Sequence, residues 1–198
     1  MAAHTPLAVL DLVPISSGST ASQALRNSID LAQQTERFGY ARYWFAEHHL
    51  NPGVAGTSPA VVLALTAAAT SAIRLGAGAV QLGHRTALST VEELGLLDAL
   101  HPGRFDLGLG RSGGSRAPLE PKVPALVGAR ASDGYTANGL RIPAPFDFRP
   151  LLNSPRFALH RTLLQQPEAQ TPEYDTQIDD IPALLAGTYR DEEWARRA

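Results

Sequence analysis

The sequence contains no cysteine, and this absence removes several kinds of site at once. A chain without thiols forms no disulfide, has no thiolate ligand for a metal and cannot use a cysteine nucleophile. The same absence fits a reducing compartment, so we expect a cytoplasmic protein.

Charge of one sign and long hydrophobic runs are also lacking. The net charge is −2, which gives no electrostatic reason to expect nucleic acid or an anionic membrane as a partner. The N-terminal stretch MAAHTPLAVLDLVP has neither a basic segment nor a long apolar one, so we expect no signal peptide. Threonine, serine, Arg74 and glycines interrupt the longest apolar-rich stretch, PAVVLALTAAATSAIRLGAGAV, which argues against a membrane span.

What the sequence does contain is a regular alternation of β-rich and helical segments. Apolar residues make up 44% of the 198, enough for one globular domain with a sizeable core. The predicted strands are 7–13, 42–46, 73–80 and 104–110, and the predicted helices are about 22–38, 58–71 and 89–100. Strands separated by helices pair in parallel, which leaves a doubly wound sheet or a (βα)8 barrel. A complete barrel needs about 250 residues.

The character of the chain changes after Gly114. Ten of the 15 prolines follow this residue. We therefore expect residues 1–114 to hold three βα units and the fourth strand, and residues 115–172 to form an irregular insertion with short β pieces at ALVGA and GLRIPAPF. Residues 173–198 should contain a helix over about 174–189, and the sequence then ends before a fifth strand. The predicted fold is an incomplete TIM-type barrel.

Polar residues follow three of the predicted strands, at the edge where parallel α/β folds bind ligands. They are Glu47-His48-His49, then Gln81 to Arg85, then Arg111 to Gly114. His101 and Arg104 precede a strand instead, so we expect structural roles for them at the opposite edge.

The pair His48-His49 suggests metal binding, but the pattern argues against it. Adjacent residues on extended backbone point in opposite directions, and the HExxH spacing is absent. We expect no metal. Two alternatives stay open, namely histidines satisfied by the backbone at a strand end, or acid–base and hydrogen-bonding work near neutral pH.

Two glycine patterns are ambiguous from sequence alone. Residues 108–113 match GxGxxG, but prolines follow where a dinucleotide-binding helix would have to begin. Arg111 is either a phosphate ligand or an exposed loop arginine. The small residues of LGAGAV (75–80) indicate close approach by a ligand or by another chain segment, or they relieve crowding inside a barrel.

Several motifs occur together in an order that is specific to one family. They are LAVLDLVP, WFAEHH, IRLGAGAVQL and EELGLLDALHPGRFDLGLGR. Over residues 5 to 114 the chain resembles the N-terminal half of bacterial-luciferase-like flavin-dependent monooxygenases. The segment YDTQIDDIPALLAGTY resembles the family helix that follows an insertion.

The resemblance implies a function and a set of residues. It implies reduced FMN, supplied by a separate flavin reductase and used with O2 to oxidise a small organic substrate. His48 matches a histidine near the flavin, with Glu47 beside it as a second catalytic candidate. Gly78 and Ala79 match a non-proline cis peptide against the flavin ring, and Arg111 matches an arginine that contacts its phosphate. The resemblance also implies a homodimer through the second and third helices.

Other readings stay open. A deazaflavin-dependent oxidoreductase has the same fold, and the Glu-His-His triplet favours the oxygen-using branch by analogy. Alternatively, a half barrel could be catalytically inert and act as the partner of another barrel subunit.

Overall fold

The structure is a computed structural model that describes residues 5–111, 134–144, 154–165 and 168–190. The chain divides into two compact units, residues 1–114 with 168–198, and residues 115–167. The C-terminal helix therefore groups with the N-terminal βα segments rather than standing alone.

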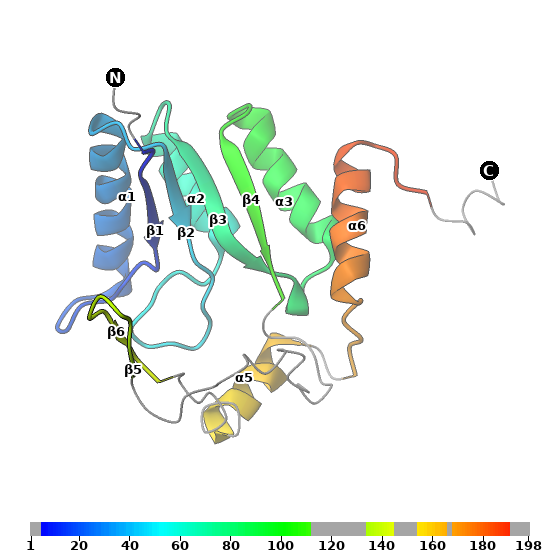
Figure 1. The fold of residues 1–198 in the computed structure, drawn as a ribbon. Helices are drawn as coiled ribbons and strands as arrows, with labels where there is room; N and C mark the ends of the chain where they lie inside the picture. The colour runs from blue at the N-terminus through cyan, green and yellow to red at the C-terminus, as the bar shows by residue number, and fades with distance from the viewer. Residues whose placement is uncertain (1–4, 112–133, 145–153, 166–167, 191–198) are drawn as a thin grey trace. The chain divides into compact units, whose positions relative to one another are not determined.

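The first unit is a parallel sheet with helices between its strands (Figure 1). The strand order is β1-β2-β3-β4, so each strand pairs with its neighbour in sequence. The strands are β1 (Ala8–Asp11), β2 (Arg42–Phe45), β3 (Arg74–Gln81) and β4 (Phe105–Gly110). The helices are α1 (Ala21–Arg37), α2 (Pro59–Ala69), α3 (Ala87–Leu100) and α6 (Tyr174–Leu185), with a short 3-10 turn η1 (Leu82–His84). This confirms the predicted incomplete α/β barrel.

Local sequence signals explain where the helices begin and end. The Thr20 hydroxyl accepts a hydrogen bond from the Gln23 amide and so caps the start of α1. Gly39, just past the end, has a φ of 74°, the left-handed conformation that glycine adopts without steric cost. Pro59 opens α2 in the first turn, where its missing N–H costs nothing. Helix α3 begins two residues earlier than predicted, because Thr86 caps the Ser89 amide.

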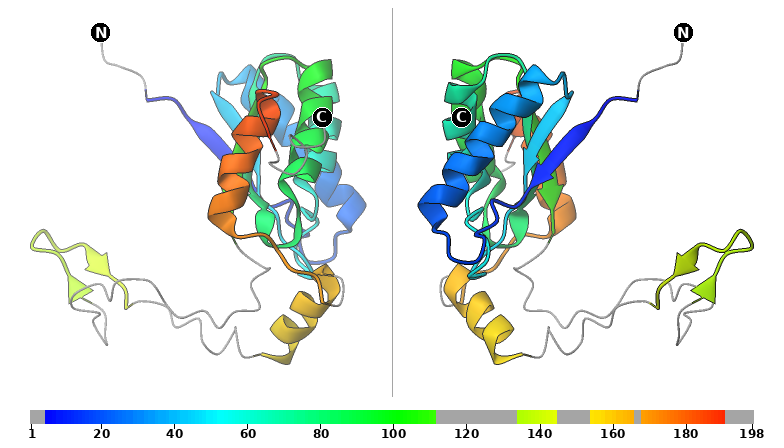
Figure 2. Two further views of the ribbon diagram at one scale, coloured as in Figure 1. Left: turned by 90° about the vertical axis from the view of Figure 1, so that its right-hand side faces the viewer. Right: turned by 90° about the vertical axis from the view of Figure 1, so that its left-hand side faces the viewer.

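Alternation along the strands gives the sheet two different faces. One face lies under α1, α2 and α3, and the core packs there (Figure 2). Tyr43, Phe45, Leu75 and Ala77 point to this side and are fully buried. The other face, which would line the interior of a barrel, is covered by no helix among the described residues of this unit.

Helix α6 fills the position beside α3 where a fourth barrel helix belongs. Its side chain Gln177 is buried and donates from Nε2 to the carbonyl of Leu82, 3.1 Å away. The hydroxyl of Tyr174 donates to the Leu109 carbonyl at 3.3 Å, which ties the helix to the end of β4. The described residues of this unit therefore form four strands and four α-helices.

At the amino ends of the strands, Arg104 has the structural role that the sequence predicts. Its guanidinium donates to the carbonyls of Ala67, Thr70 and Ile73, which joins the end of α2 to the start of β3. Charge-assisted bonds to several carbonyls hold this corner together.

Where the structure describes it, the second unit contains a small hairpin and a helix. Strands β5 (Gly134–Tyr135) and β6 (Arg141–Ile142) pair antiparallel, and β6 lies within the predicted piece GLRIPAPF. The predicted piece ALVGA lies outside the described residues. Helix α5 (Pro155–Leu164) was not predicted, because Pro155 resembles loop punctuation in sequence but occupies a first helical turn. None of the helices in the described ranges is long and apolar enough to cross a membrane.

Candidate active site at the carboxyl ends of the strands

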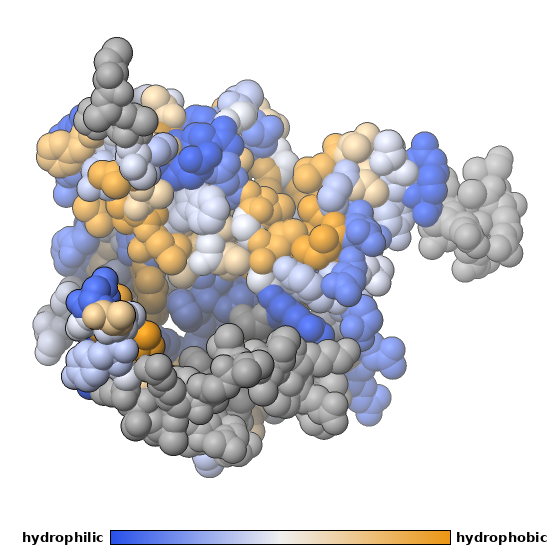
Figure 3. All heavy atoms as spheres, in the orientation of Figure 1, coloured by the Kyte–Doolittle hydropathy of each residue, from blue (hydrophilic) through white to orange (hydrophobic). Residues whose placement is uncertain are grey.

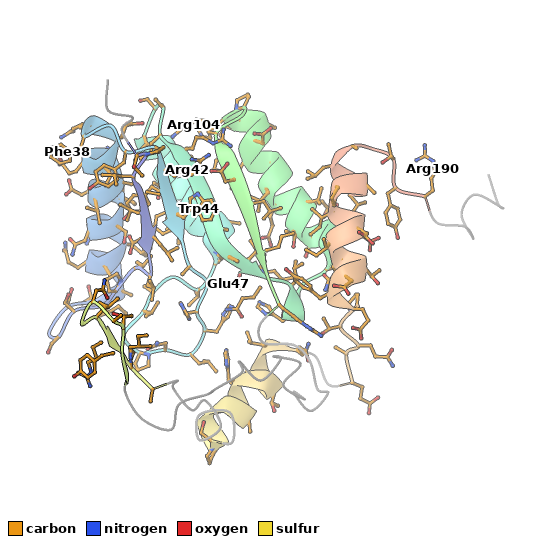
Figure 4. The ribbon with its side chains drawn as sticks, in the orientation of Figure 1. Phe38, Arg42, Trp44, Glu47, Arg104 and Arg190 are labelled. Carbon is orange, nitrogen blue, oxygen red and sulfur yellow. The ribbon has the colours of Figure 1, made fainter. Side chains whose placement is uncertain are left out.

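Glu47, just after β2, is the centre of the best-defined polar cluster at this edge (Figure 4). Its side chain has no exposed surface. Oε1 lies 2.8 Å from Nε2 of His49 and 3.1 Å from Nε2 of His84, and Oε2 accepts the amide of Gln81 at 2.9 Å. A buried carboxylate is stable only when paired and hydrogen-bonded, and here both oxygens are used.

The alternation of the backbone after β2 separates the two adjacent histidines, as predicted. Glu47 and His49, two residues apart, both point into the cluster. His48 lies between them and its side chain is exposed. The His48 amide donates to the Gly56 carbonyl at 2.9 Å, which fixes the backbone while the imidazole faces outward.

The end of β3 supplies the other half of the cluster. The side-chain amide of Gln81 donates to the Glu47 carbonyl at 2.6 Å, so β2 and β3 are joined by side chain and backbone together. The rings of His49 and His84 meet edge to face, with centroids 4.9 Å apart. Arg85 lies 3.5 Å from Glu47 Oε1 and donates to both oxygens of Glu93 on α3, at 3.1 and 3.0 Å.

The electrostatics of the cluster keep Glu47 ionised. Burial by itself raises the pKa of this carboxyl. Hydrogen bonds from His49, His84 and the Gln81 amide, with the charge of Arg85, outweigh burial and lower the pKa to about 2. Because an ionised carboxylate only accepts hydrogen bonds, Nε2 carries the proton in both imidazoles.

The same three side chains could hold a metal ion, since one ligand atom from each of Glu47, His49 and His84 lies within 4.8 Å of the others. Two observations favour a hydrogen-bonded network instead. The positive guanidinium of Arg85 lies 3.5 Å from the oxygen that a cation would use. Both imidazole nitrogens also lie at hydrogen-bond distance from that one oxygen, which places their protons where an ion would have to sit.

Of the predicted cofactor residues, Gly78 and Ala79 lie within β3, and Arg111 follows β4 directly. The bond between Gly78 and Ala79 is a cis peptide, as the family resemblance implies. A Cβ at Gly78 would lie 2.9 Å from the ring of Trp44, and one at Gly76 would lie 2.6 Å from its Nε1. These glycines therefore make room for the Trp44 indole, so packing within the barrel interior explains them.

Arg111 and Ala79 are closer to the edge where a ligand would bind. A Cβ at Gly110 would lie 3.2 Å from the methyl group of Ala79. The absence of a side chain at Gly110 therefore leaves room for this methyl group between β3 and β4. Arg111 follows directly and is exposed. No helix begins at the glycines of residues 108–110, so the dinucleotide reading gains no support from the described part of this loop.

Sequence reasoning did not assign roles to His84, Gln81 or Arg85. No local motif marks them, because they lie more than thirty residues from Glu47. Their position at the carboxyl end of β3 and just beyond it was the available signal, since the carboxyl ends of neighbouring parallel strands meet at one edge.

Comparison with known proteins identifies the family. The family model described as luciferase-like monooxygenase matches residues 5–119. The chain belongs to the luciferase-like monooxygenase family.

Individual family members share this N-terminal region. A luciferase-like monooxygenase of Escherichia coli is 47% identical over 107 residues, which cover 54% of this chain and 32% of that protein. The N-acetyl-S-alkylcysteine monooxygenase of Bacillus subtilis is 45% identical over 108 residues, covering 54% and 32%. The chain thus spans about a third of the length of these curated relatives.

Solved structures agree on the fold. Apo-MsnO8 superimposes with a TM-score of 0.63 at 29% identity, covering 92% of this chain and 43% of that one. The oxygenating constituent of 3,6-diketocamphane monooxygenase from Pseudomonas putida, solved with FMN, gives 0.52 at 20% identity and covers 58% and 35%. At that identity the second match supports the fold alone.

Proposed function

We propose that this chain is part of a flavin-dependent monooxygenase that uses reduced FMN and O2 to oxidise a small organic substrate. The observation that carries the proposal is the arrangement at the carboxyl ends of β2 and β3 in a member of this family. There a buried network fixes Glu47 and leaves the neighbouring His48 facing outward. Membership of the luciferase-like family supports an oxidoreductase.

The residues of the chain fit a flavin in character. The side chain of Ala79 is a single methyl group and Gly110 has none, so a flat ring can lie against this part of the sheet. The guanidinium of the exposed Arg111 presents several coplanar N–H donors that can bind a phosphate. A bound reduced flavin would supply the electrons for oxygen chemistry. Everything else required of the protein is binding, orientation and control of protons.

His48 is the residue we assign to proton control. Its imidazole is exposed at the strand end and its backbone is held by the bond to Gly56, so the ring can meet a ligand without rearrangement of the strand. Imidazole can donate or accept a proton near neutral pH. We assign Glu47 a positioning role instead, since its oxygens are occupied and its side chain is buried.

The test is an anaerobic titration of the 198-residue chain with reduced FMN, followed by a pulse of oxygen. We expect saturable binding and a reoxidation rate that differs from that of free reduced FMN. His48→Ala should retain binding and change the reoxidation rate. His101→Ala, at the opposite edge of the sheet, is the matched control and should behave as wild type. Absence of binding by the chain alone would refute independent activity.

A second experiment tests Arg111. Wild type should bind FMN more tightly than riboflavin, because only FMN offers a phosphate to the guanidinium. Arg111→Ala should lose most of this preference, roughly tenfold in affinity for one charge-assisted contact. The assignment fails if wild type shows no preference, or if the variant keeps it. A parallel titration with a deazaflavin tests the alternative cofactor, because its affinity can be compared with that of FMN.

The proposal includes two partners. A flavin reductase would deliver the reduced cofactor. A second copy would dock on α2 and α3, whose outer faces carry exposed apolar side chains, namely Val61, Leu65, Leu88, Leu96 and Leu100. Sedimentation analysis of wild type and Leu96→Lys tests the dimer, which the lysine should weaken.

A further inference from the structure

The loop after β2, which carries His48, is exposed on one side and bonded to the end of β1 on the other. Residues 50–53 of this loop are exposed. Figure 3 shows hydrophilic surface next to the apolar surface of the strands. Water competes for hydrogen bonds on the exposed side, whereas hydrogen bonds shielded from water are electrostatically stronger. The contacts of the loop with the end of β1 therefore decide where His48 lies.

Backbone contacts join the loop to the segment that follows β1. The Ala55 amide donates to the Val13 carbonyl at 2.9 Å, next to an antiparallel bridge. A Cβ at Gly56 would lie 2.8 Å from the Leu12 carbonyl oxygen, so the loop lies directly against the backbone at the end of β1. The Gly56 carbonyl in turn accepts the His48 amide at 2.9 Å. The position of His48 is thus linked through the backbone to that of Val13.

Val13 has a backbone conformation that its own side chain disfavours. Its φ is 57°, in the left-handed region, which is a steric outlier for a β-branched residue. A valine with extended backbone would direct its carbonyl elsewhere, and the bond to Ala55 would be lost. The conformation therefore needs a compensating interaction.

The carboxylate of Asp11 supplies this interaction. Its Oδ1 accepts the Val13 amide at 2.7 Å, a bond from an aspartate to the backbone two residues on that stabilises a turn. Its Oδ2 accepts the hydroxyl of Tyr43 at 2.5 Å. Asp11 is only 7% exposed, so both bonds are shielded from water, and a charged acceptor makes them stronger than neutral ones.

We propose that Asp11 is a positioning residue for His48. Its carboxylate holds Val13 in the left-handed conformation, and Val13 holds the loop that carries the imidazole. This role rests on the proposed function, in which His48 controls a proton. Asp11 acts through the backbone of the loop and needs no contact with the ligand.

Hydrogen exchange of backbone amides, followed by NMR on the 198-residue chain without flavin, measures how often the loop opens. In Asp11→Ala the amides of His48 and Ala55 should exchange about 10- to 100-fold faster than in wild type, as expected when a bond to a charged group is lost. The Leu75 amide, which donates to the Arg104 carbonyl in the core of the sheet, reports global unfolding instead.

Tyr43→Phe is the matched control, because it removes the other bond to the same carboxylate and keeps the bond to Val13. It should accelerate the exchange of the Leu75 amide, since global stability is lost. The amides of His48 and Ala55 should change by about threefold at most. A purely structural role of Asp11 would give the same pattern in Asp11→Ala as in this control.

A double variant shows whether Asp11 acts through Val13. Glycine adopts a positive φ without steric cost, so Asp11→Ala/Val13→Gly should no longer depend on the carboxylate. Its His48 amide should exchange within about threefold of the rate in Val13→Gly alone. If Asp11→Ala alone does not fold, folding of the double variant supports the proposal, and failure of both to fold overturns it.

The role of Asp11 and the role of His48 are tested separately. Amide exchange needs no flavin, so a chain that binds no flavin refutes the proposed function while the exchange result still decides the role of Asp11. With flavin bound, Asp11→Ala should retain binding and change the reoxidation rate in the same direction as His48→Ala. The positioning role is wrong if the loop amides of Asp11→Ala exchange as in wild type, if Tyr43→Phe opens the loop equally, or if an opened loop leaves the reoxidation rate unchanged.

Discussion

Replacing Glu47 by glutamine tests the buried network directly, because the side chain keeps its shape and loses only its charge. The carboxyl has a pKa of about 2 in the folded protein against an ordinary value of 4.5. At about 1.4 kcal/mol per pH unit, this difference contributes about 3 kcal/mol to stability at pH 7. The side chain is fully buried, so solvent does not screen this contribution.

The sign of the pH dependence follows from the direction of the pKa shift. The folded protein holds Glu47 ionised at pH values where the unfolded chain has already protonated it. The contribution is therefore complete above about pH 4.5 and is lost as the pH falls towards 2. Glu47→Gln should be about 3 kcal/mol less stable than wild type at pH 7. This difference in stability should decrease steadily as the pH falls from about 4.5 to about 2.

Urea denaturation followed by circular dichroism at a series of pH values measures this gap. Comparing the two proteins at each pH cancels the titration of the other carboxylates. Glu92→Gln, an exposed glutamate on α3, is the matched control and should cost less than about 0.5 kcal/mol. The reasoning is refuted if Glu47→Gln costs no more than this control, or if its cost is the same at pH 3 as at pH 7.

Three further substitutions test the packing of the sheet and its helices, each by the free energy of unfolding. Gly108→Ala should destabilise the protein by about 1–3 kcal/mol, because its Cβ would lie 2.3 Å from the Ala77 carbonyl oxygen, whereas Gly95→Ala meets nothing within 4 Å in a helix and should stabilise by about 0.5–1 kcal/mol. Equal effects of the two would contradict the close approach of β3 and β4. Tyr43→Phe should cost about 1.5–3 kcal/mol, because it removes a buried 2.5 Å hydrogen bond to Asp11, and a neutral result would show that this bond contributes nothing.

The order of the helices and strands could be predicted because the sequence signals that start and end each of them are local. A cap such as Thr20 and a left-handed glycine such as Gly39 act within one or two turns of their own helix. The opposite directions of His48 and His49 also follow from local backbone geometry. Helix α5 was not predicted because it begins with Pro155, and proline is common both in loops and in first helical turns.

The glycines of β3 show where local reasoning fails. From sequence, Gly76 and Gly78 suited a ligand, a neighbouring backbone or a crowded interior equally well. The register of β2 against β3 decides among these, since it places Trp44 directly opposite Gly76. A side chain on the neighbouring strand fills the space, and nothing in the local sequence of β3 encodes it.

The sequence by itself determined the alternation of strands and helices, the parallel pairing that this alternation requires, and the edge at which polar residues gather. Only the tertiary structure decided that His84 shares the carboxylate of Glu47, that α6 completes the fourth helical position, and that Arg42 and Arg74 both donate to Asp106. The physical reason is distance along the chain. Periodicity and capping act over a few residues, whereas crossovers and strand register set which side chains meet across thirty residues or more.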